Sequence, residues 1–249
     1  MVKKTHHFLV LGLILTFLGC AQVVAPTGGE RDSTPPEVTN SKPENGTTNF
    51  DANRIVIDFD EFVILKNLKE QLIVSPPLKY PLKSKIKGKS LELQIKDTLK
   101  PNTTYVLNFG NAIVDLNENN PIAGFQYVFS TGDELDSLKL SGMVVDAFSL
   151  TVEKDYLIML YPKFETDSVP SKELPIYVAR TDEEGNYTIT NVKEGDYQLV
   201  GLLDKNDNYL YDRVDEKVSF SDELISVQTK NKPIRSYAFL KKDNKQFIE

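Results

Sequence analysis

The residues with the clearest capacity for chemistry form an oxygen-rich run near the C-terminal end of the chain. Its members are Asp204, Asn206, Asn208, Asp212, Asp215 and Glu216. The first three alternate along the chain, as the first, third and fifth ligands of a calcium loop do, and the acidic residues that follow stand where such a loop closes. Calcium takes six to eight oxygen ligands. The spacing therefore predicts a calcium site, and calcium is the single candidate cofactor.

A second interpretation of this run needs no metal. Tyr209 stands where an EF-hand loop has glycine, and no helical pattern flanks the run, which is closer to the D-x-N-x-D loops of extracellular β domains. Asp and Asn side chains also form turns by accepting hydrogen bonds from their own backbone. A metal-free Asx-rich hairpin is therefore the alternative, and the sequence leaves both open.

Cys20 is the other chemically distinctive residue, because it is the chain's single cysteine. It follows a basic start at Lys3 and Lys4, an apolar run over 8–18, and Gly19, which is the order of a secretory signal. The run has about 11 residues, too few to span a bilayer. The segment Phe-Leu-Gly-Cys at 17–20 resembles a bacterial lipobox. The resemblance implies that 1–19 is removed and that Cys20 carries the fatty acyl chains, palmitate among them, of a Gram-negative outer-membrane lipoprotein.

Composition excludes several classes of protein. The 249 residues include 29 basic and 36 acidic side chains, and both histidines precede Cys20, so a chain that begins at Cys20 has no histidine. Histidine-based triads and zinc sites that need imidazole are therefore excluded. The net charge of −7 argues against a nucleic-acid partner, whose phosphates require clustered cations.

The rest of the chain indicates an all-β protein that begins beyond a flexible tether. Residues 20–35 are rich in Gly, Pro, Ser and Thr, which is typical of a linker. Apolar and polar residues then alternate over 54–60 and again over 91–95. This period predicts short, half-buried strands, and their close spacing favours an antiparallel β-sandwich.

The segment Leu-Lys-Pro-Asn-Thr-Thr-Tyr at 99–105 has the L-x-P-x-T-x-Y spacing of immunoglobulin-like and fibronectin-like sandwiches. In those folds the tyrosine bonds back to upstream backbone, so Tyr105 is expected to be structural. Together with the pattern that closes at 125–131, this makes residues 36–131 resemble a bacterial Ig-like domain of the surface-layer type.

After a polar linker at 132–137, a second β pattern runs over 138–240 and a polar tail follows at 241–249. The motifs Ser-Gly-Met-Val at 141–144, Thr-Asp-Glu-Glu-Gly-Asn-Tyr at 181–187 and Gly-Asp-Tyr at 195–197 resemble the carboxypeptidase regulatory-like, transthyretin-like (prealbumin-like) sandwich. The expected fold class is therefore all-β, with two consecutive antiparallel sandwiches. The usual tight second hairpin of this family is not visible over 150–176.

Three further sets of residues have a structural and a functional interpretation. The carboxylates Asp58, Asp60 and Glu61 are of the type that glycoside hydrolysis uses, but they lie on an alternating strand in a chain without tryptophan. The tyrosines at 187, 197, 209 and 211 are expected to pack across strands rather than to form a contact surface. Alternating lysines at 83, 85, 87 and 89 indicate protection of an edge strand rather than a phosphate site.

These observations predict a lipid-anchored, non-enzymatic binding or scaffolding protein of the Gram-negative outer membrane, facing the periplasm or the cell surface. Its expected partners are the membrane and an envelope protein or glycan. The alternative is a surface glycan-binding accessory lipoprotein for polysaccharide uptake.

Overall fold

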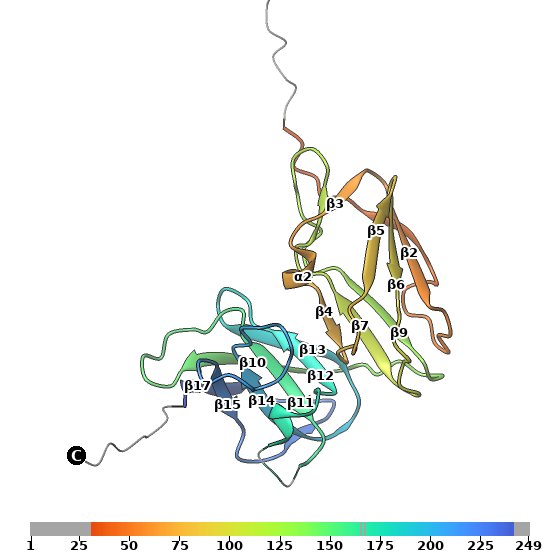
Figure 1. Cartoon of the computed structure of the whole chain (residues 1–249). Coiled ribbons are helices and arrows are strands. Elements are labelled where there is room, and N and C mark those ends of the chain that lie inside the picture. The colour runs from red at the N-terminus through yellow and green to blue at the C-terminus, as the bar shows by residue number, and fades with distance from the viewer. Residues whose placement is uncertain (1–30, 165, 167, 242–249) are drawn as a thin grey trace, which may run out of the picture. The chain divides into compact units, whose positions relative to one another are not determined.

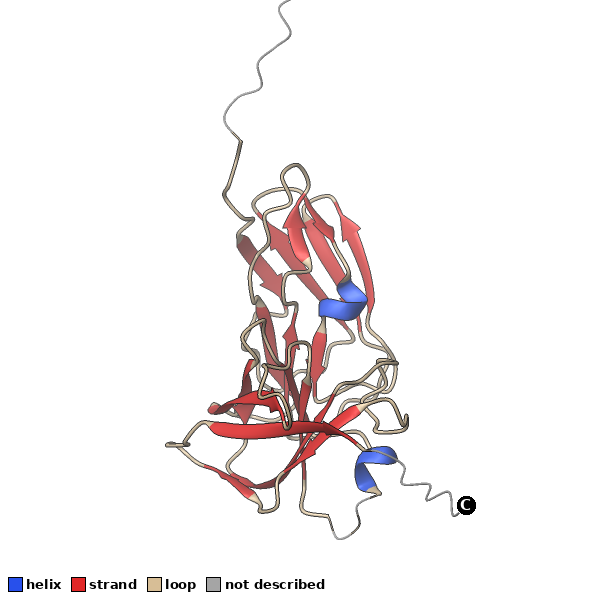
Figure 2. Ribbon diagram, turned by 90° about the vertical axis from the view of Figure 1, so that its left-hand side faces the viewer, coloured by secondary structure: helices blue, strands red, loops and turns tan. Residues whose placement is uncertain are grey.

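The computed structural model describes residues 31–164, 166 and 168–241. The signal segment 1–19, Cys20, the tether up to residue 30 and the tail from residue 242 lie outside the described residues. Within the described part the prediction of an all-β fold is confirmed, because strands dominate and the helical elements are only two short turns (Figure 2). These are α2 (Leu68–Gln71) and the 3-10 turn η1 (Val169–Ser171).

The strands up to residue 130 pair among themselves. A four-stranded antiparallel sheet has the order β1-β2-β6-β5, formed by β1 (Val38–Lys42), β2 (Arg54–Phe59), β6 (Ser90–Gln94) and β5 (Lys83–Lys87) (Figure 1). A second sheet has the order β4-β7-β9, formed by β4 (Ile73–Ser75), β7 (Thr104–Asn108) and β9 (Gln126–Ser130). The short strands β3 (Val63–Leu65) and β8 (Ile113–Asp115) form a separate pair.

The core of this first set of strands is the one that alternation predicts. In β2, Ile55 and Ile57 are fully buried while Arg54 is exposed, and in β6, Leu91 and Leu93 are fully buried. Both expected strands are therefore confirmed to within a residue at their ends. Strand β5 is the last in its sheet, so the prediction that its lysines mark an edge strand is also confirmed.

The strands after residue 138 form one sheet of eight. Its order is β12-β11-β14-β15-β17-β10-β13, and β16 also pairs with β14. The strands are β10 (Leu138–Asp146), β11 (Leu157–Tyr161), β12 (Tyr177–Arg180), β13 (Asn186–Val192), β14 (Gly195–Leu202), β15 (Lys217–Phe220), β16 (Ile225–Val227) and β17 (Ile234–Leu240). One pair, β10 with β17, is parallel and departs from the all-antiparallel expectation. A parallel pair needs a crossover, and here the other strands of the sheet lie between the two in sequence.

Strand β11 explains why this sheet has two cores. All five of its residues are buried, and they face alternate sides. Ile158 and Leu160 belong to a cluster with β10, β13 and β14, whereas Leu157 and Met159 belong to a second cluster on the other side. A strand buried on both faces has a continuous apolar sequence rather than an alternating one. The second face is covered by side chains of two long loops, 162–176, which carries Phe164, and 203–216.

Residues 33–249 group as one compact unit, although no described strand before residue 131 pairs with one after residue 138. Hydrogen bonds join the two sets of strands directly. The backbone N–H of Val178 donates to Ser75 Oγ at 3.0 Å, and Arg180 donates to the carbonyl of Glu70. The domain boundaries expected from the sequence stay a prediction.

A testable consequence concerns Gly201 in β14. A Cβ at this position would lie 2.3 Å from Ser219 Oγ and 2.5 Å from a ring carbon of the buried Tyr156. Both neighbours are held in a filled core, so Gly201→Ala is expected to destabilise the fold by about 1–3 kcal/mol through overpacking. Thermal unfolding followed by circular dichroism measures this as a lowered midpoint.

The matched control is Gly195→Ala in the same strand, where the nearest heavy atom would be 3.3 Å away. Its midpoint should fall less. A midpoint for Gly201→Ala equal to that of the control would show that the close packing around Gly201 is wrong.

Candidate functional site

The oxygen-rich run identified in the sequence is the loop that joins β14 to β15. Its middle is held against the sheet because Tyr209 and Tyr211 pack on the apolar cluster beneath it. Tyr209 has a φ of +62°, so the left-handed residue that a calcium loop needs at this place is present without glycine. A left-handed tyrosine is strained by about 1–2 kcal/mol. Burial of its ring offsets that cost.

Asp204 and Asp212 are occupied by groups within the loop. The carboxylate of Asp204 accepts the backbone N–H of Asn206 at 3.1 Å and that of Tyr209 at 2.7 Å. The carboxylate of Asp212 accepts the side-chain amides of Asn206 at 3.2 Å and Asn208 at 2.7 Å. The turn therefore satisfies its own donors.

Glu216 and Asp215 close the end of the loop in different ways. Glu216 is fully buried, and its two oxygens accept the backbone N–H groups of Lys205 at 3.1 Å and Arg213 at 3.2 Å. Asp215 is half-exposed and forms ion pairs with Arg213 at 3.0 Å and Lys205 at 3.1 Å. Hydrogen bonds from Arg213 and Lys205 lower the pKa of Asp215 to about 2.

In the predicted calcium site, Asn206 and Asn208 turn their amide groups to Asp212, while Glu216 binds backbone N–H groups and Asp215 binds cations. Across the described residues, no group of three or more Asp, Glu, His or Cys side chains is arranged to hold a metal ion. The geometry supports the metal-free hairpin, in which hydrogen bonds from backbone N–H groups and side-chain amides occupy the carboxylate oxygens that would otherwise bind the metal. The calcium site stays a prediction that this arrangement does not favour.

The variant Glu216→Gln tests whether the loop is held by calcium or by its own hydrogen bonds. Glutamine has one acceptor oxygen for two backbone donors, so one partly buried N–H loses its partner to the buried side chain, and stability should fall by about 1 kcal/mol. If the loop is metal-free, the midpoint of thermal unfolding drops equally in calcium and in chelator. A wild-type midpoint that rises with calcium would contradict this, because a ligand that binds only the folded state stabilises it.

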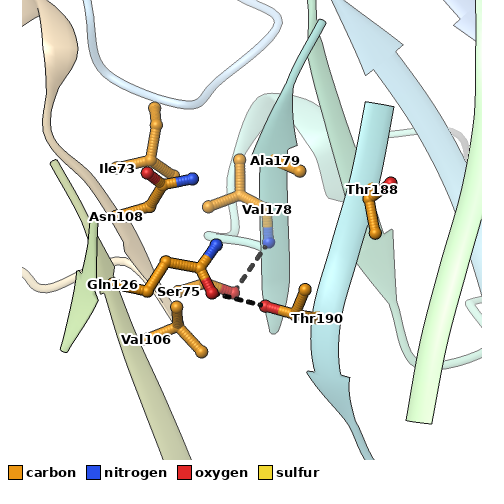
Figure 3. Close-up of a pocket in the computed structure, with 9 residues that line it drawn as sticks. All are labelled: Ile73, Ser75, Val106, Asn108, Gln126, Val178, Ala179, Thr188 and Thr190. Atoms are coloured by element: carbon orange, nitrogen blue, oxygen red, sulfur yellow. Dashed lines mark hydrogen bonds between the residues drawn. The ribbon is translucent and has the colours of Figure 1, made fainter. Parts of the chain in front are cut away.

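A shallow groove of about 330 Å³ lies beside this loop. Its lining consists of Ser171, Tyr211, Asp212, Arg213, Val214 and Lys241. The groove is open, and it holds one aromatic ring together with charged groups of both signs. A second cavity, lined by residues of β4, β7, β9, β12 and β13, has a volume of about 20 Å³ and room for about one water molecule. Figure 3 shows that cavity, where Thr190 donates to Gln126 at 3.4 Å.

Tyr105 makes the backward contact expected of a tyrosine corner. The backbone N–H of Lys100 donates to its hydroxyl at 2.9 Å, and burial raises the pKa of Tyr105.

A second corner, which sequence reasoning did not identify, lies at Tyr197, whose hydroxyl donates to the carbonyl of Lys193 at 2.8 Å. The hydroxyl of Tyr177 accepts from the N–H of Lys193 at 3.1 Å. The Gly195-x-Tyr197 spacing is the local signal from which this corner could have been predicted.

The other sequence candidates have structural partners. Tyr187 and Tyr197 are buried, which confirms packing for these two and removes them from any exposed contact surface. Asp58 accepts the hydroxyl of Ser90 at 2.6 Å, and Asp60 accepts the backbone N–H of Glu37 at 2.8 Å. Neither of these two carboxylates faces either described pocket.

Asp115 shows the same use of a carboxylate in the first set of strands. It is buried and accepts four successive backbone N–H groups, those of residues 117–120, at 2.6–3.0 Å. Burial alone would raise the pKa of Asp115, but these four donors outweigh it and lower the pKa.

One charged cluster was not predicted. Lys217 lies between Asp146, at 2.9 Å, and Glu153, and it is less exposed than most lysines of the chain. Asp146 also accepts the backbone N–H groups of Phe148 and Ser149 at 2.9 Å. These N–H donors and Lys217 hold the pKa of Asp146 far below its usual value. Residues 71 positions apart form this pair, so no local pattern could reveal it.

The low pKa of Asp146 predicts a specific response to acid. A carboxylate whose pKa is lower in the folded than in the unfolded chain contributes stability above the unfolded pKa, near 3.8 here, and loses it as pH falls toward the folded pKa. Asp146→Asn removes that contribution, so its midpoint of unfolding should fall less than the wild-type midpoint between about pH 5 and pH 2. Melts across this range measure it.

Asp182→Asn is the comparison variant, because Asp182 also accepts backbone N–H groups, from Glu184 and Asn186, but pairs with no lysine among the described residues. A pH profile of Asp146→Asn that matches the wild type would contradict the assignment.

Comparison with known proteins matches one part of the chain to a family. Residues 32–131 match the bacterial Ig-like domain, which agrees with the resemblance expected for 36–131. No curated protein matches the chain.

Solved structures are similar only at a distance. An L,D-transpeptidase from Mycobacterium smegmatis is 14% identical over 66% of this chain and 79% of its own, with a TM-score of 0.28. The N-terminal part of the bacterial S-layer protein SbsC is 12% identical over 84% of this chain and 45% of its own, with a TM-score of 0.27. BcpA, the major pilin subunit of Bacillus cereus, is 13% identical over 81% and 70%, with a TM-score of 0.24.

Proposed function

We propose that this chain is a non-enzymatic binding or scaffolding protein, held at the outer membrane of a Gram-negative cell by acyl chains on Cys20. The observation that carries the proposal is the position of the single cysteine, directly after an apolar run and Gly19. One cysteine in an exported chain has no internal disulfide partner, and acylation gives it a purpose. Two or three acyl chains on one residue are enough for stable anchoring.

The use of carboxylates in the described residues supports a non-enzymatic role. Asp115, Asp204 and Glu216 each accept two or more backbone N–H groups. A carboxylate that is filled with backbone donors is poorly suited to abstract or deliver a proton, because a general acid or base needs the substrate within hydrogen-bond reach. The match of 32–131 to a bacterial Ig-like domain is consistent with this role.

No described helix is long and apolar enough to cross a membrane. The glycan-binding alternative retains only the open groove beside Tyr211, since Tyr187 and Tyr197 are buried.

Metabolic labelling with a palmitate analogue tests the anchor. The full chain, expressed in a Gram-negative cell, should incorporate the label and float with the outer membrane. Cys20→Ala should lose the label, because the thiol that accepts the acyl chain is absent. Ser33→Ala serves as control, since it alters a residue before the first strand without touching the lipobox.

Label in the Cys20→Ala chain, or unlabelled wild type at the outer membrane, would overturn the proposal. Protease treatment of intact cells then shows whether the folded part of the chain lies at the cell surface or in the periplasm. Loss of the full-length chain indicates the cell surface, and protection indicates the periplasm.

A further inference from the structure

The outer face of the four-stranded sheet β1-β2-β6-β5 gathers cations from β1, β2 and β5, and from Lys96 just past the end of β6. The register places Lys42 opposite Val56, Val56 opposite Glu92, and Glu92 opposite Lys85, so these four side chains cross the sheet in one row. Because side chains alternate along a strand, the residues on this face are those that alternate with the buried core. We call this surface the basic face. Its cations are Lys42, Arg54, Lys83, Lys85, Lys87 and Lys96, and its carboxylates are Asp58 and Glu92.

The positive charge of the basic face is incompletely neutralised. Glu92 pairs with both Arg54 and Lys87, the latter at 2.9 Å. Asp58 accepts hydrogen bonds from Ser90 and Asn40. Within the described part of the chain, no carboxylate lies within ion-pair distance of the ammonium groups of Lys83, Lys85 or Lys96.

Two of these ammonium groups lie side by side. Lys83 pairs with Gln94, two residues before Lys96 on the same face of the sheet, and the nearness of the Lys83 ammonium lowers the pKa of Lys96 because the two like charges repel. Long side chains at diagonal positions on neighbouring strands are within reach of each other, and like charges there repel, so an anion beside both would relieve the repulsion. The arrangement therefore favours a negatively charged occupant.

The face is exceptional in an acidic chain. Residues 32–131 contain 12 acidic and 11 basic side chains, whereas residues 132–241 contain 21 acidic and 13 basic ones. The surplus of negative charge thus lies in the second segment. An anionic surface would attract the basic face and repel the later segment, which gives the chain a preferred side toward such a surface.

The position of the anchor brings one anionic surface within reach. Strand β1 is the first strand of this sheet and begins at Val38, 18 residues after Cys20. A chain of that length extends at most about 60 Å. The four strands together are only about 15 Å wide. A bilayer that holds acyl chains on Cys20 is therefore close to all of the basic face.

We propose that the basic face docks on the anionic phospholipid headgroups of the bilayer in which Cys20 is anchored. This inference rests on the proposed function, because the tether supplies the effective concentration that a modest patch of charge needs. Anionic headgroups attract clustered lysines near the membrane surface. The acyl chains hold the protein at the bilayer, and the basic face sets which surface of the first sandwich lies against it. Lysines that protect an edge strand thereby also orient the protein.

The test adds the acylated full chain to preformed vesicles of phosphatidylcholine, with or without phosphatidylglycerol. Flotation reports the anchor, and the rate at which a membrane-impermeant reagent acylates individual lysines, read by mass spectrometry, reports docking. Lys83 and Lys85 should be labelled at least about threefold more slowly on the anionic vesicles. Raising salt to about 1 M shortens the Debye length to about 3 Å and should restore the rate. The exposed Lys139 and Lys230 should not change.

Two triple variants with the same change in charge sharpen the result. Lys83→Gln, Lys85→Gln, Lys87→Gln should abolish the lipid-dependent protection of Lys42 and Lys96. Lys139→Gln, Lys230→Gln, Lys232→Gln should preserve it. All six side chains are exposed, and equal unfolding midpoints confirm that neither variant alters the fold.

The outcomes separate the two proposals. Flotation with both kinds of vesicle, without a difference in labelling, overturns docking and leaves the anchor intact. Failure to float with phosphatidylcholine overturns the anchor and docking together. Protection by a soluble anionic polysaccharide but not by phosphatidylglycerol would show a glycan site and would also overturn docking on lipid.

Discussion

A backbone N–H that leaves water needs an acceptor, and this chain supplies many of those acceptors with carboxylates. Asp115 gathers four successive N–H groups, and Glu216, fully buried, joins the two ends of the 203–216 loop. Asp146 and Asp182 do the same at two other turns. Strand-rich folds with long loops depend on such closures, because turn residues cannot join the ladders.

The need to satisfy backbone N–H groups also shapes the loops that cover one face of the eight-stranded sheet. Strand β11 is apolar throughout, so both of its faces must be covered. One cover is the opposing strands, and the other is the pair of loops that carry Phe164, Tyr209 and Tyr211. Those loops can lie on the sheet only if their own polar groups are satisfied, which is the role of Asp204, Asp212 and Glu216. Residues that look like metal ligands in the sequence thus act as hydrogen-bond acceptors in a loop that packs on the sheet.

Acidic and basic side chains are used differently in this chain. Most acidic side chains with described partners accept hydrogen bonds inside turns or pair with a nearby cation, as Asp215 does with Arg213. The cations of the first sheet are arranged differently, on an open surface with two carboxylates among them. The part of the molecule best suited to long-range attraction is therefore a flat sheet face rather than a loop or a pocket.

Local patterns in the sequence determined the strands, because alternation reports burial of one face without any knowledge of partners. This held for 54–59 and 90–94, for the edge strand with its lysines, and for the turn that carries Tyr105. The proposed anchor at Cys20 likewise rests on local order in the sequence alone. Tertiary structure decided the rest: the pairing of Lys217 with Asp146, the parallel contact of β10 with β17, and the placing of Lys42 and Lys83 on one face of the same sheet. The physical reason is that pairing and register join residues far apart in the chain, and no period along the sequence records which strand becomes a neighbour.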